Sequence, residues 1–263
     1  TVRLADRAAA AEWLDRLERE ERNGARRFDW KLTRIEFLLY DRNDTQTAAR
    51  LAQQLQTEAI RPEDAVRANI RLGDVDRLSG RYEEARRKYA AAQDRYQELF
   101  QGARRGSAQQ TALGPRRPRE SDTGADAISA NPLAEGWRVA AVREASFHVT
   151  VRSYLRQSRP FEARRVLRQW ELELPLTKLT GDFPLAEAEY YVAIGDAERA
   201  ARILRAYREG VEISSALPEA MALELDCLRQ LKRTPELKDL ARDILRRFPV
   251  HPVAKRAREV LEP

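Results

Sequence analysis

Apolar and small residues recur at helical intervals through most of the chain. In residues 72–92, Ala85, Tyr89 and Ala92 stand at positions i, i+4 and i+7, which lie on one face of an α-helix. Gly80 comes shortly before this face, and glycine is common just after the end of a helix. The segment therefore predicts two helices joined by a turn, with Gly80 ending the first and Tyr82 opening the second.

This helical pair is repeated along the chain. The small residue of the second helix recurs as Ala48, Ala85, Ala163, Ala200 and, more weakly, as Leu237. Three of the four steps between these positions are 37 residues long. A constant period predicts one structural unit used several times, in which each unit buries its apolar face against its neighbours.

Residues 72–92 resemble the tetratricopeptide repeat family. Seven residues occupy positions of that family's signature: Leu72, Gly73, Gly80, Tyr82, Ala85, Tyr89 and Ala92. Asn69 and Gln97 depart from it, because the family favours an aromatic residue and a proline there. The resemblance implies an all-α fold, a right-handed α-solenoid of helical hairpins whose first helices line a concave groove. It also implies a non-catalytic scaffold that binds a partner protein or peptide in that groove.

One step of the repeat is longer, and residues 102–136 account for the excess. They have no apolar periodicity and are rich in Gly, Pro, Ser and Asp, as loops and linkers are. We expect a disordered, flexible insertion, either a mobile loop or a short motif that folds on a partner. The predicted organisation is residues 1–101 with an N-terminal helix (4–22) and two hairpins, then the insertion, then 137–263 with three hairpins and a C-terminal helix (251–261).

The first helices of the hairpins are expected to line a basic trough with aromatic residues at one end. Arg and aromatic side chains are enriched at binding hot spots, and the guanidinium fork recognises carboxylates. This surface predicts an acidic or extended peptide as the ligand. The candidate groove residues are Trp30, Arg34, Phe37, Tyr40, Arg67, Ile70, Asp74, Arg77, His148, Arg152 and Arg156.

The charge of the chain modifies this expectation only a little. The 48 basic and 42 acidic residues give a net charge of +6, and 42 of the basic residues are Arg, a preference typical of a GC-rich, bacterial coding sequence. Most helical arginines stand within a few residues of Asp or Glu, as on a solvated helix face. Two alternatives to the scaffold stay open: a helical accessory domain of a larger envelope enzyme, and a protein that binds nucleic acid or another anionic polymer through its arginines.

Residues that could perform catalysis or bind a cofactor are sparse. His148 and His251 stand in no metal-binding motif, and Cys227, which cannot form an internal disulfide, lies in an apolar helical stripe. Glu187 and Glu189 are two residues apart and do not share a helix face. The sequence therefore predicts no catalytic, cofactor or metal site, and no apolar run is long enough to span a membrane.

A second resemblance concerns the C-terminal end. Residues 242–261, RDILRRFPVHPVAKRAREVL, look like the phrase that closes repeats in bacterial envelope scaffolds of the outer-membrane assembly lipoprotein and Tol-Pal coordinator type. Both a cytoplasmic and an envelope-associated location stay open. Because the chain begins with Thr1, we expect it to be a processed or excised fragment.

Overall fold

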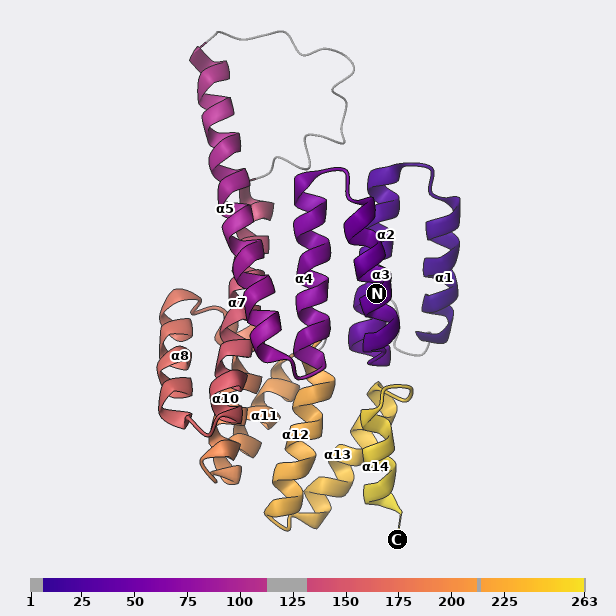
Figure 1. Ribbon diagram of the computed structural model, residues 1–263. Coiled ribbons are helices and arrows are strands. Elements are labelled where there is room, and N and C mark those ends of the chain that lie inside the picture. Colours follow the sequence, from indigo (N-terminus) through magenta and orange to yellow (C-terminus); the bar gives the residue numbers. More distant parts are fainter. Residues whose placement is uncertain (1–6, 113–131, 212–213, 263) are drawn as a thin grey trace.

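The structure is a computed structural model that describes residues 7–112, 132–211 and 214–262 (Figure 1). The first range contains α1 (Arg7–Glu20), α2 (Gly24–Phe37), the π-helix η2 (Leu38–Arg42), α3 (Thr45–Glu58), α4 (Pro62–Leu78) and α5 (Tyr82–Ala112). The second contains α7 (Pro132–Arg156), α8 (Pro160–Glu173), α9 (Thr177–Thr180), α10 (Phe183–Ala193) and α11 (Ala197–Gly210), and the third α12 (Leu217–Gln230), α13 (Thr234–Arg247) and α14 (Val253–Leu261). The described residues are helices and connections without a strand, so the predicted all-α class is confirmed for them.

The turn between α4 and α5 forms as its sequence predicts. Gly80 adopts a φ of 74°, a left-handed conformation that favours glycine, and α5 begins at Tyr82. Gly73, which lies on α4 seven residues before Gly80, packs against the second helix. A Cβ atom added there would come within 2.7 Å of Cε1 of Tyr89, so the two helices approach closely because this residue has no side chain.

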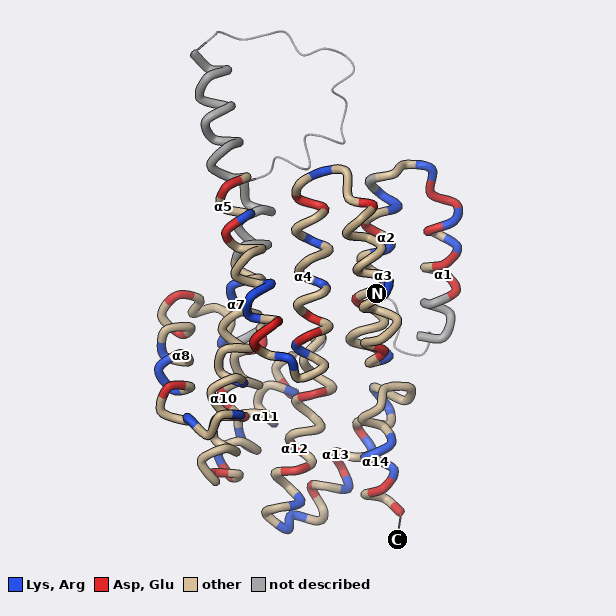
Figure 2. Tube along the Cα trace, viewed as in Figure 1, with Lys and Arg blue, Asp and Glu red and all other residues tan. Residues whose placement is uncertain are grey.

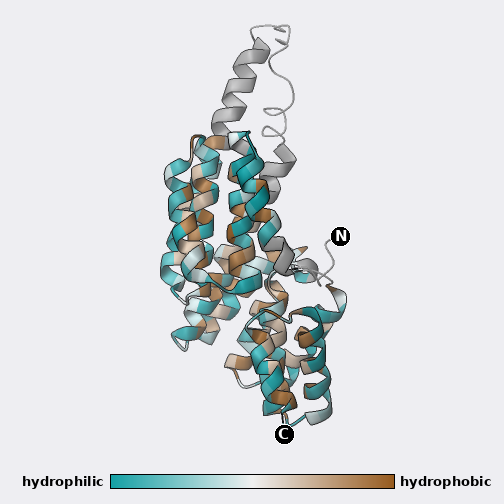
Figure 3. Ribbon diagram, turned by 90° about the vertical axis from the view of Figure 1, so that its right-hand side faces the viewer, coloured by the Kyte–Doolittle hydropathy of each residue, from teal (hydrophilic) through white to brown (hydrophobic). Residues whose placement is uncertain are grey.

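Helices that follow one another in the chain pack against one another. Their apolar residues form four successive clusters, around Ile35 and Leu55, then Tyr89, then Trp170, and finally Leu204 and Leu228. Alternate helices also touch, as in the pairs α2–α4, α7–α10 and α10–α12. The core is therefore divided along the chain, and apolar residues face the helix interfaces while polar residues face outward (Figure 3).

The repeated small residues are buried between packed helices. Ala48, Ala85, Ala163 and Ala200 have no exposed surface, whereas Leu237 is half-buried. An alanine at such a position lets the backbones of two helices approach, because a larger side chain would hold them apart. Leu237, which fits the repeat least well in the sequence, is thus also the most exposed of the five residues in the structure.

Helices extend further into the predicted insertion than the sequence analysis expected. α5 continues to Ala112 and α7 begins at Pro132, so both ends of the 102–136 segment are helical, and residues 113–131 lie outside the described residues. Residues 103–112 are rich in Ala, Arg and Gln, which have high helix propensity. The absence of an apolar stripe predicts that a segment is not packed, but it does not stop a good helix former from extending an existing helix.

The terminal helices are shorter than predicted. The helix expected over residues 4–22 is described over Arg7–Glu20, with residues 4–6 outside the described part, and the one expected over 251–261 begins at Val253. Both acidic and basic residues occur on most of the described helices (Figure 2). Within the described residues, no helix combines the length and the apolar character needed to cross a lipid bilayer.

Candidate functional site

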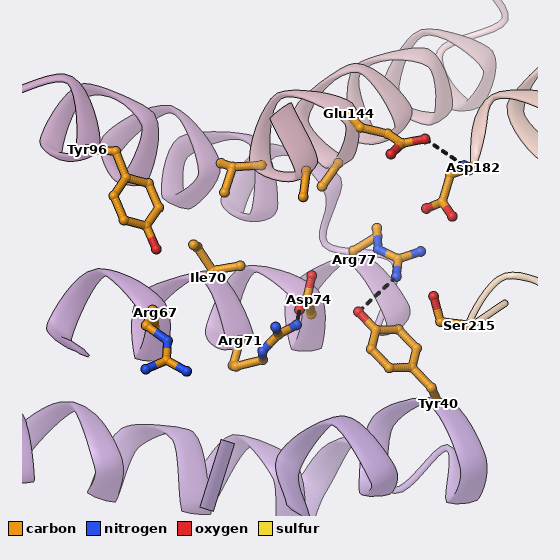
Figure 4. A pocket seen from close by; sticks show the side chains of 13 residues that line it. Tyr40, Arg67, Ile70, Arg71, Asp74, Arg77, Tyr96, Glu144, Asp182 and Ser215 are labelled. Carbon is orange, nitrogen blue, oxygen red and sulfur yellow. Dashed lines mark hydrogen bonds and ion pairs between the residues drawn. The ribbon is translucent and has the colours of Figure 1, made fainter. Parts of the chain in front are cut away.

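A pocket of about 350 Å³ opens beside α4 (Figure 4). One face of α4 forms its floor, since residues 67, 70, 71, 74 and 77 follow each other at helical intervals. Its volume is near the lower end of the range of about 300–1,000 Å³ for ligand sites. The lining residues are Tyr40, Arg67, Ile70, Arg71, Asp74, Arg77, Tyr96, Ala141, Val142, Glu144, Ala145, Asp182 and Ser215.

Five of the residues predicted for the groove meet in this pocket. Arg67, Ile70, Asp74 and Arg77 come from α4, and Tyr40 comes from η2, 37 residues before Arg77. The π-helical turn is where the chain leaves α2, and Tyr40 points from it toward Arg77 (Figure 4). Short π-helical segments often stand at functional sites because they change the direction in which a side chain points.

Arg77 is the most isolated charge in the pocket. Only 6% of its surface is exposed, and its guanidinium carbon lies 5.9 Å from the centre of the Tyr40 ring. Its Nη2 donates to the Tyr40 hydroxyl over a long 3.5 Å, and its buried Nε has no hydrogen-bond partner. Within the described residues, no carboxylate oxygen lies within 4.0 Å of this guanidinium.

The environment nevertheless keeps Arg77 positively charged. Burial by itself would lower the pKa of its guanidinium. The nearby Tyr40 and Tyr89 hydroxyls and the carboxylates of Asp182 and Asp74 outweigh this effect and raise the pKa well above its usual value. Asp182 and Asp74 therefore act on Arg77 through their fields and not through direct ion pairs.

The other two arginines of the pocket are already paired. Arg67 and Arg71 connect α4 to the acidic residues of α2 and to acids of their own helix. The ion pairs are Arg67–Asp29 (2.7 Å), Arg67–Asp64 (3.4 Å), Arg71–Glu36 (2.5 Å) and Arg71–Asp74 (2.6 Å). Asp74 also accepts a hydrogen bond from the Tyr89 hydroxyl at 2.6 Å. These two guanidinium groups therefore hold helices together, and each has carboxylate partners of its own.

Two carboxyl groups form the opposite wall of the pocket. Oε1 of Glu144 accepts a hydrogen bond from the backbone N–H of Asp182 at 2.7 Å. Burial, together with the charge of Asp182, raises the pKa of Glu144 to about 7. A Cβ atom on residue 181 would overlap this same Oε1, so Gly181 leaves the space in which the Glu144 carboxyl sits.

The pKa of the Asp182 carboxyl is shifted in the opposite direction to that of Glu144. Burial would raise the pKa of its carboxyl, but the hydrogen bond from His148 and the positive charges of His148, Arg77 and Arg152 lower the pKa far below its usual value. Nδ1 of His148 lies 3.2 Å from Oδ2 of Asp182. The pocket wall therefore holds one carboxylate that is ionised and one carboxyl that is close to half-protonated at neutral pH.

His148 and Arg152 lie behind this wall and do not line the pocket. The sequence analysis placed both on an open groove, whereas the structure leaves His148 with no exposed surface and Arg152 with 6%. Arg152 donates to Glu189 of α10 through Nε at 3.0 Å and to Glu219 of α12 through Nη2 at 2.8 Å. The two residues therefore join α7 to α10 and α12 through buried ion pairs.

The hydrogen bonds of this ion network also set the charge of His148. Burial and the nearby Arg152 would lower the pKa of its imidazole. The hydrogen bonds to Asp182 and to Glu189, the latter 3.4 Å from Nε2, raise the pKa above its usual value. A charged His148 is thus compensated by two carboxylates, which is the usual condition for a buried charge.

The remaining groove candidates are placed elsewhere. Arg34 pairs with Asp15 at 2.9 Å and with Glu18 at 3.2 Å, both on α1. Trp30, one turn before Arg34 on α2, is half-buried, and Phe37, one turn after it, is contacted by the Arg42 guanidinium at 5.4 Å. None of these three α2 residues lines the pocket.

The register of α2 explains this displacement. The core face of α2 is formed by Phe28, Leu32 and Ile35. A second face reaches α4, where Asp29 pairs with Arg67 and Glu36 pairs with Arg71. The sequence assigned the aromatic stripe of α2 to the groove, but that stripe faces a different side. Periodicity shows which residues share a face, and it does not show which neighbour the face meets.

Arg156 has a structural position at the edge of α7. Its Nη1 donates to the backbone carbonyl of Gly80 at 2.6 Å. This bond satisfies an oxygen at the end of α4, where helical carbonyls lack partners. The side chain thus ties α7 to the α4–α5 turn and does not line the pocket.

Several pocket residues were missed by the sequence analysis. Glu144 could have been found, because it precedes His148 by four residues and Arg152 by eight, so the three share one face of α7. Arg71 could also have been found, since it stands next to Ile70 on the α4 face. Asp182 and Ser215 belong to the connections before α10 and α12, and no local sequence pattern predicts that they line a pocket.

Groups for metal or nucleophilic chemistry are not assembled in the described part of the chain. No three His, Cys, Asp or Glu side chains there are placed to hold a metal ion. Burial, with a smaller contribution from Asp226, raises the pKa of Cys227 to about 11. The thiol therefore stays protonated at neutral pH, which suits a packing residue and not a nucleophile.

Comparisons of the chain with protein-family models, with curated proteins and with solved structures found no match in any of the three. A function therefore has to be inferred from the residues of this chain and their arrangement.

Proposed function

We propose that the chain is a non-catalytic scaffold of tetratricopeptide type, which holds an extended segment of a partner protein against the pocket beside α4. The observation behind this proposal is that side chains of two successive helical pairs converge there. Tyr40 comes from the first pair, and Arg67, Ile70 and Arg77 come from the second. Stacked helical repeats bind their partners on the surface that such side chains line.

Two side-chain contacts support a stacked arrangement of equal units. Arg77 reaches Tyr40 and Arg152 reaches Glu189, and each pair spans 37 residues in the sequence. This separation equals the repeat period of the sequence. A contact between residues one period apart is expected when each helical pair lies beside the next in a regular file.

The lining of the pocket is also suited to a polypeptide. Tyr40 and the arginines are of the residue types enriched at binding hot spots. Ile70, Val142 and Ala145 add an apolar surface between the charged groups. Such a mixture of apolar wall and a few directed polar groups is typical of specific sites.

The arrangement of surface arginines gives less support to binding of nucleic acid. Many exposed guanidinium groups pair with a carboxylate three residues away on the same helix. Examples are Arg86–Glu83 (2.7 Å), Arg95–Glu98 (2.6 Å), Arg159–Glu162 (2.7 Å) and Arg242–Asp239 (2.7 Å). Such pairs cancel the local positive field that a phosphate backbone requires.

Site-specific photo-crosslinking tests the proposal. A photoreactive amino acid is placed at Ala141, which is exposed at the pocket, or at the control position Arg242, which is exposed on α13. The full chain is then expressed in the cells that make it. We expect crosslinks from position 141 to one recurring segment of one protein, mapped by mass spectrometry, and none to that segment from position 242.

Crosslinks of equal yield from both positions, or no crosslinked protein from position 141, would argue against a partner at this pocket. A peptide with the mapped sequence provides the second step. It should bind the purified chain with a 1:1 stoichiometry in calorimetry and compete with the crosslink. Turnover of a substrate by the purified chain would contradict the non-catalytic part of the proposal.

A further inference from the structure

Arg77 is a buried cation that has no anion in contact among the residues that the structure describes. It is 6% exposed, its Nε has no partner, and the carboxylate that faces it most directly, that of Asp182, is hydrogen-bonded to His148 at 3.2 Å (Figure 4). Buried charges are usually paired directly, so an arginine that lines a pocket without a direct partner is suited to hold an anion from outside. The missing partner would be an anion that enters the pocket.

We propose that the pocket is a subsite for one carboxylate, that of a Glu or Asp side chain in the partner segment, and that Arg77 is the residue that holds it. The inference rests on the proposed function for the source of the carboxylate. The guanidinium fork matches the two oxygens of a carboxylate, which can accept two parallel hydrogen bonds from it. Arg77 lines the pocket, and among the described residues its guanidinium makes only the long 3.5 Å hydrogen bond to Tyr40, so its terminal nitrogens have donors available for such a pair.

The charges around the pocket favour a single negative charge over a phosphate dianion. Arg67 and Arg71 already have two carboxylate partners each, which leaves Arg77 as the cation without one among the described lining residues. Asp182 and Asp74 also line the pocket and would repel a second negative charge. A monoanion balances Arg77, whereas a dianion exceeds it.

Neighbouring groups can complete the recognition of a carboxylate. Burial, with the charge of Asp74, raises the pKa of the Tyr40 hydroxyl, so this group keeps its proton and can donate it in a hydrogen bond. Ser215 also lines the pocket and presents a second hydroxyl on the side of Arg77 that lies toward Asp182 (Figure 4). Ile70 and Val142 provide apolar contacts for the methylene groups that precede the carboxylate.

Capped amino acids test the subsite without knowledge of the partner. The probes are the N-acetyl N-methylamides of glutamate and of glutamine, which differ only in the charge of the side chain, and inorganic phosphate serves as the dianionic probe. Binding to the full chain is followed by NMR titration at pH 8, where inorganic phosphate is mostly a dianion. We expect the glutamate probe to bind at least tenfold more tightly than either the glutamine probe or phosphate.

Variants assign the effect to Arg77. Arg77→Met should weaken binding of the glutamate probe at least tenfold, and Tyr40→Phe should weaken it by a factor of about three. Arg242→Met, an exposed arginine on α13 whose carboxylate partner is Asp239, serves as the control and should bind as the unmodified chain does. If Arg77→Met does not fold, Arg77→Lys keeps the charge, removes the fork, and should also lose most of the affinity.

Equal binding of the two amino-acid probes, tighter binding of phosphate, or full affinity in both Arg77 variants would overturn the inference. These outcomes are distinct from failure of the proposed function. If the crosslinked partner binds the Arg77→Met chain with unchanged affinity, the scaffold stands and the carboxylate subsite does not. If the glutamate probe binds through Arg77 but position 141 yields no partner, the subsite stands and the scaffold function fails.

Discussion

Two arginines, one on α4 and one on α7, show how equal burial can lead to different roles. Arg77 on α4 and Arg152 on α7 were both predicted to line the groove, and each is 6% exposed. Arg152 is held by Glu189 and Glu219 from two other helices, whereas Arg77 has no carboxylate within ion-pair distance among the described residues. Burial alone therefore does not show whether a charged residue stabilises the fold or is available to a ligand.

The acids available next to each arginine explain the difference. Arg152 lies where α7, α10 and α12 come together, and α10 and α12 each supply an acid. Beside Arg77 the acids of the opposite wall are engaged with other groups, Glu144 with the Asp182 backbone and Asp182 with His148. The space next to Arg77 is therefore a pocket, while the space next to Arg152 is occupied by the side chains of Glu189 and Glu219.

The largest expected effect follows from removal of these arginines. Arg152→Met leaves the partly buried Glu189 without its main partner, and we expect the free energy of unfolding to fall by about 3 kcal/mol or more. Arg77→Met removes a charge whose nearest carboxylates among the described residues act from beyond ion-pair distance, so we expect a smaller loss, of about 1–2 kcal/mol. Urea denaturation followed by circular dichroism measures both.

Glu189→Gln is the matched change on the acid side and should also destabilise the chain, because Arg152 then keeps only Glu219 close to it. If Arg77→Met proved as damaging as Arg152→Met, the contrast between the two arginines would be lost, and Arg77 would have to be regarded as part of the fold.

A smaller effect is expected from pH. Burial beside Asp182 raises the pKa of Glu144 from 4.5 to about 7, so the folded chain binds this proton more tightly than the unfolded chain does. Stability then falls as pH rises from about 4.5 to 7, by about 3 kcal/mol. The raised pKa of His148 acts in the same direction, because its contribution is lost as pH rises through the pKa of the folded state.

The charged groups that the Glu144 carboxyl senses are Asp182 and His148. Glu144→Gln should flatten the decline between pH 5 and pH 7 and leave the part that belongs to His148. The measurement is the urea midpoint of both chains across this range. An unchanged slope in the variant would show that Glu144 titrates near its ordinary value.

The smallest effect is expected at Arg156. Arg156→Ala removes one hydrogen bond to the carbonyl of Gly80, at a position open to solvent, and should lower the free energy of unfolding by about 1 kcal/mol or less. Binding of the glutamate probe should be unchanged, because this side chain lies outside the pocket. A tenfold loss of probe affinity would instead return Arg156 to the binding surface, where the sequence analysis had placed it.

Local patterns were enough to predict much of the α4–α5 pair. Gly80 marked the turn, Gly73 marked the close approach to Tyr89, and the face with Arg67, Ile70 and Arg77 does line a pocket. The same reasoning failed on α2, where Trp30, Arg34 and Phe37 share a face that does not line the pocket. The two helices differ because a glycine constrains the neighbouring backbone, whereas a stripe of mixed polar and aromatic residues can face solvent or any partner helix.

The sequence by itself determined the helical class, the period of 37 residues and the small residues at the helix contacts, since these depend on intervals along one chain segment. Only the tertiary structure decided that Asp182 and Ser215 reach the pocket, that Glu144 approaches Asp182, and that Arg152 is paired while Arg77 is not. Charges act through space and fall off with distance, so their partners are fixed by which helices meet and not by their positions in the sequence.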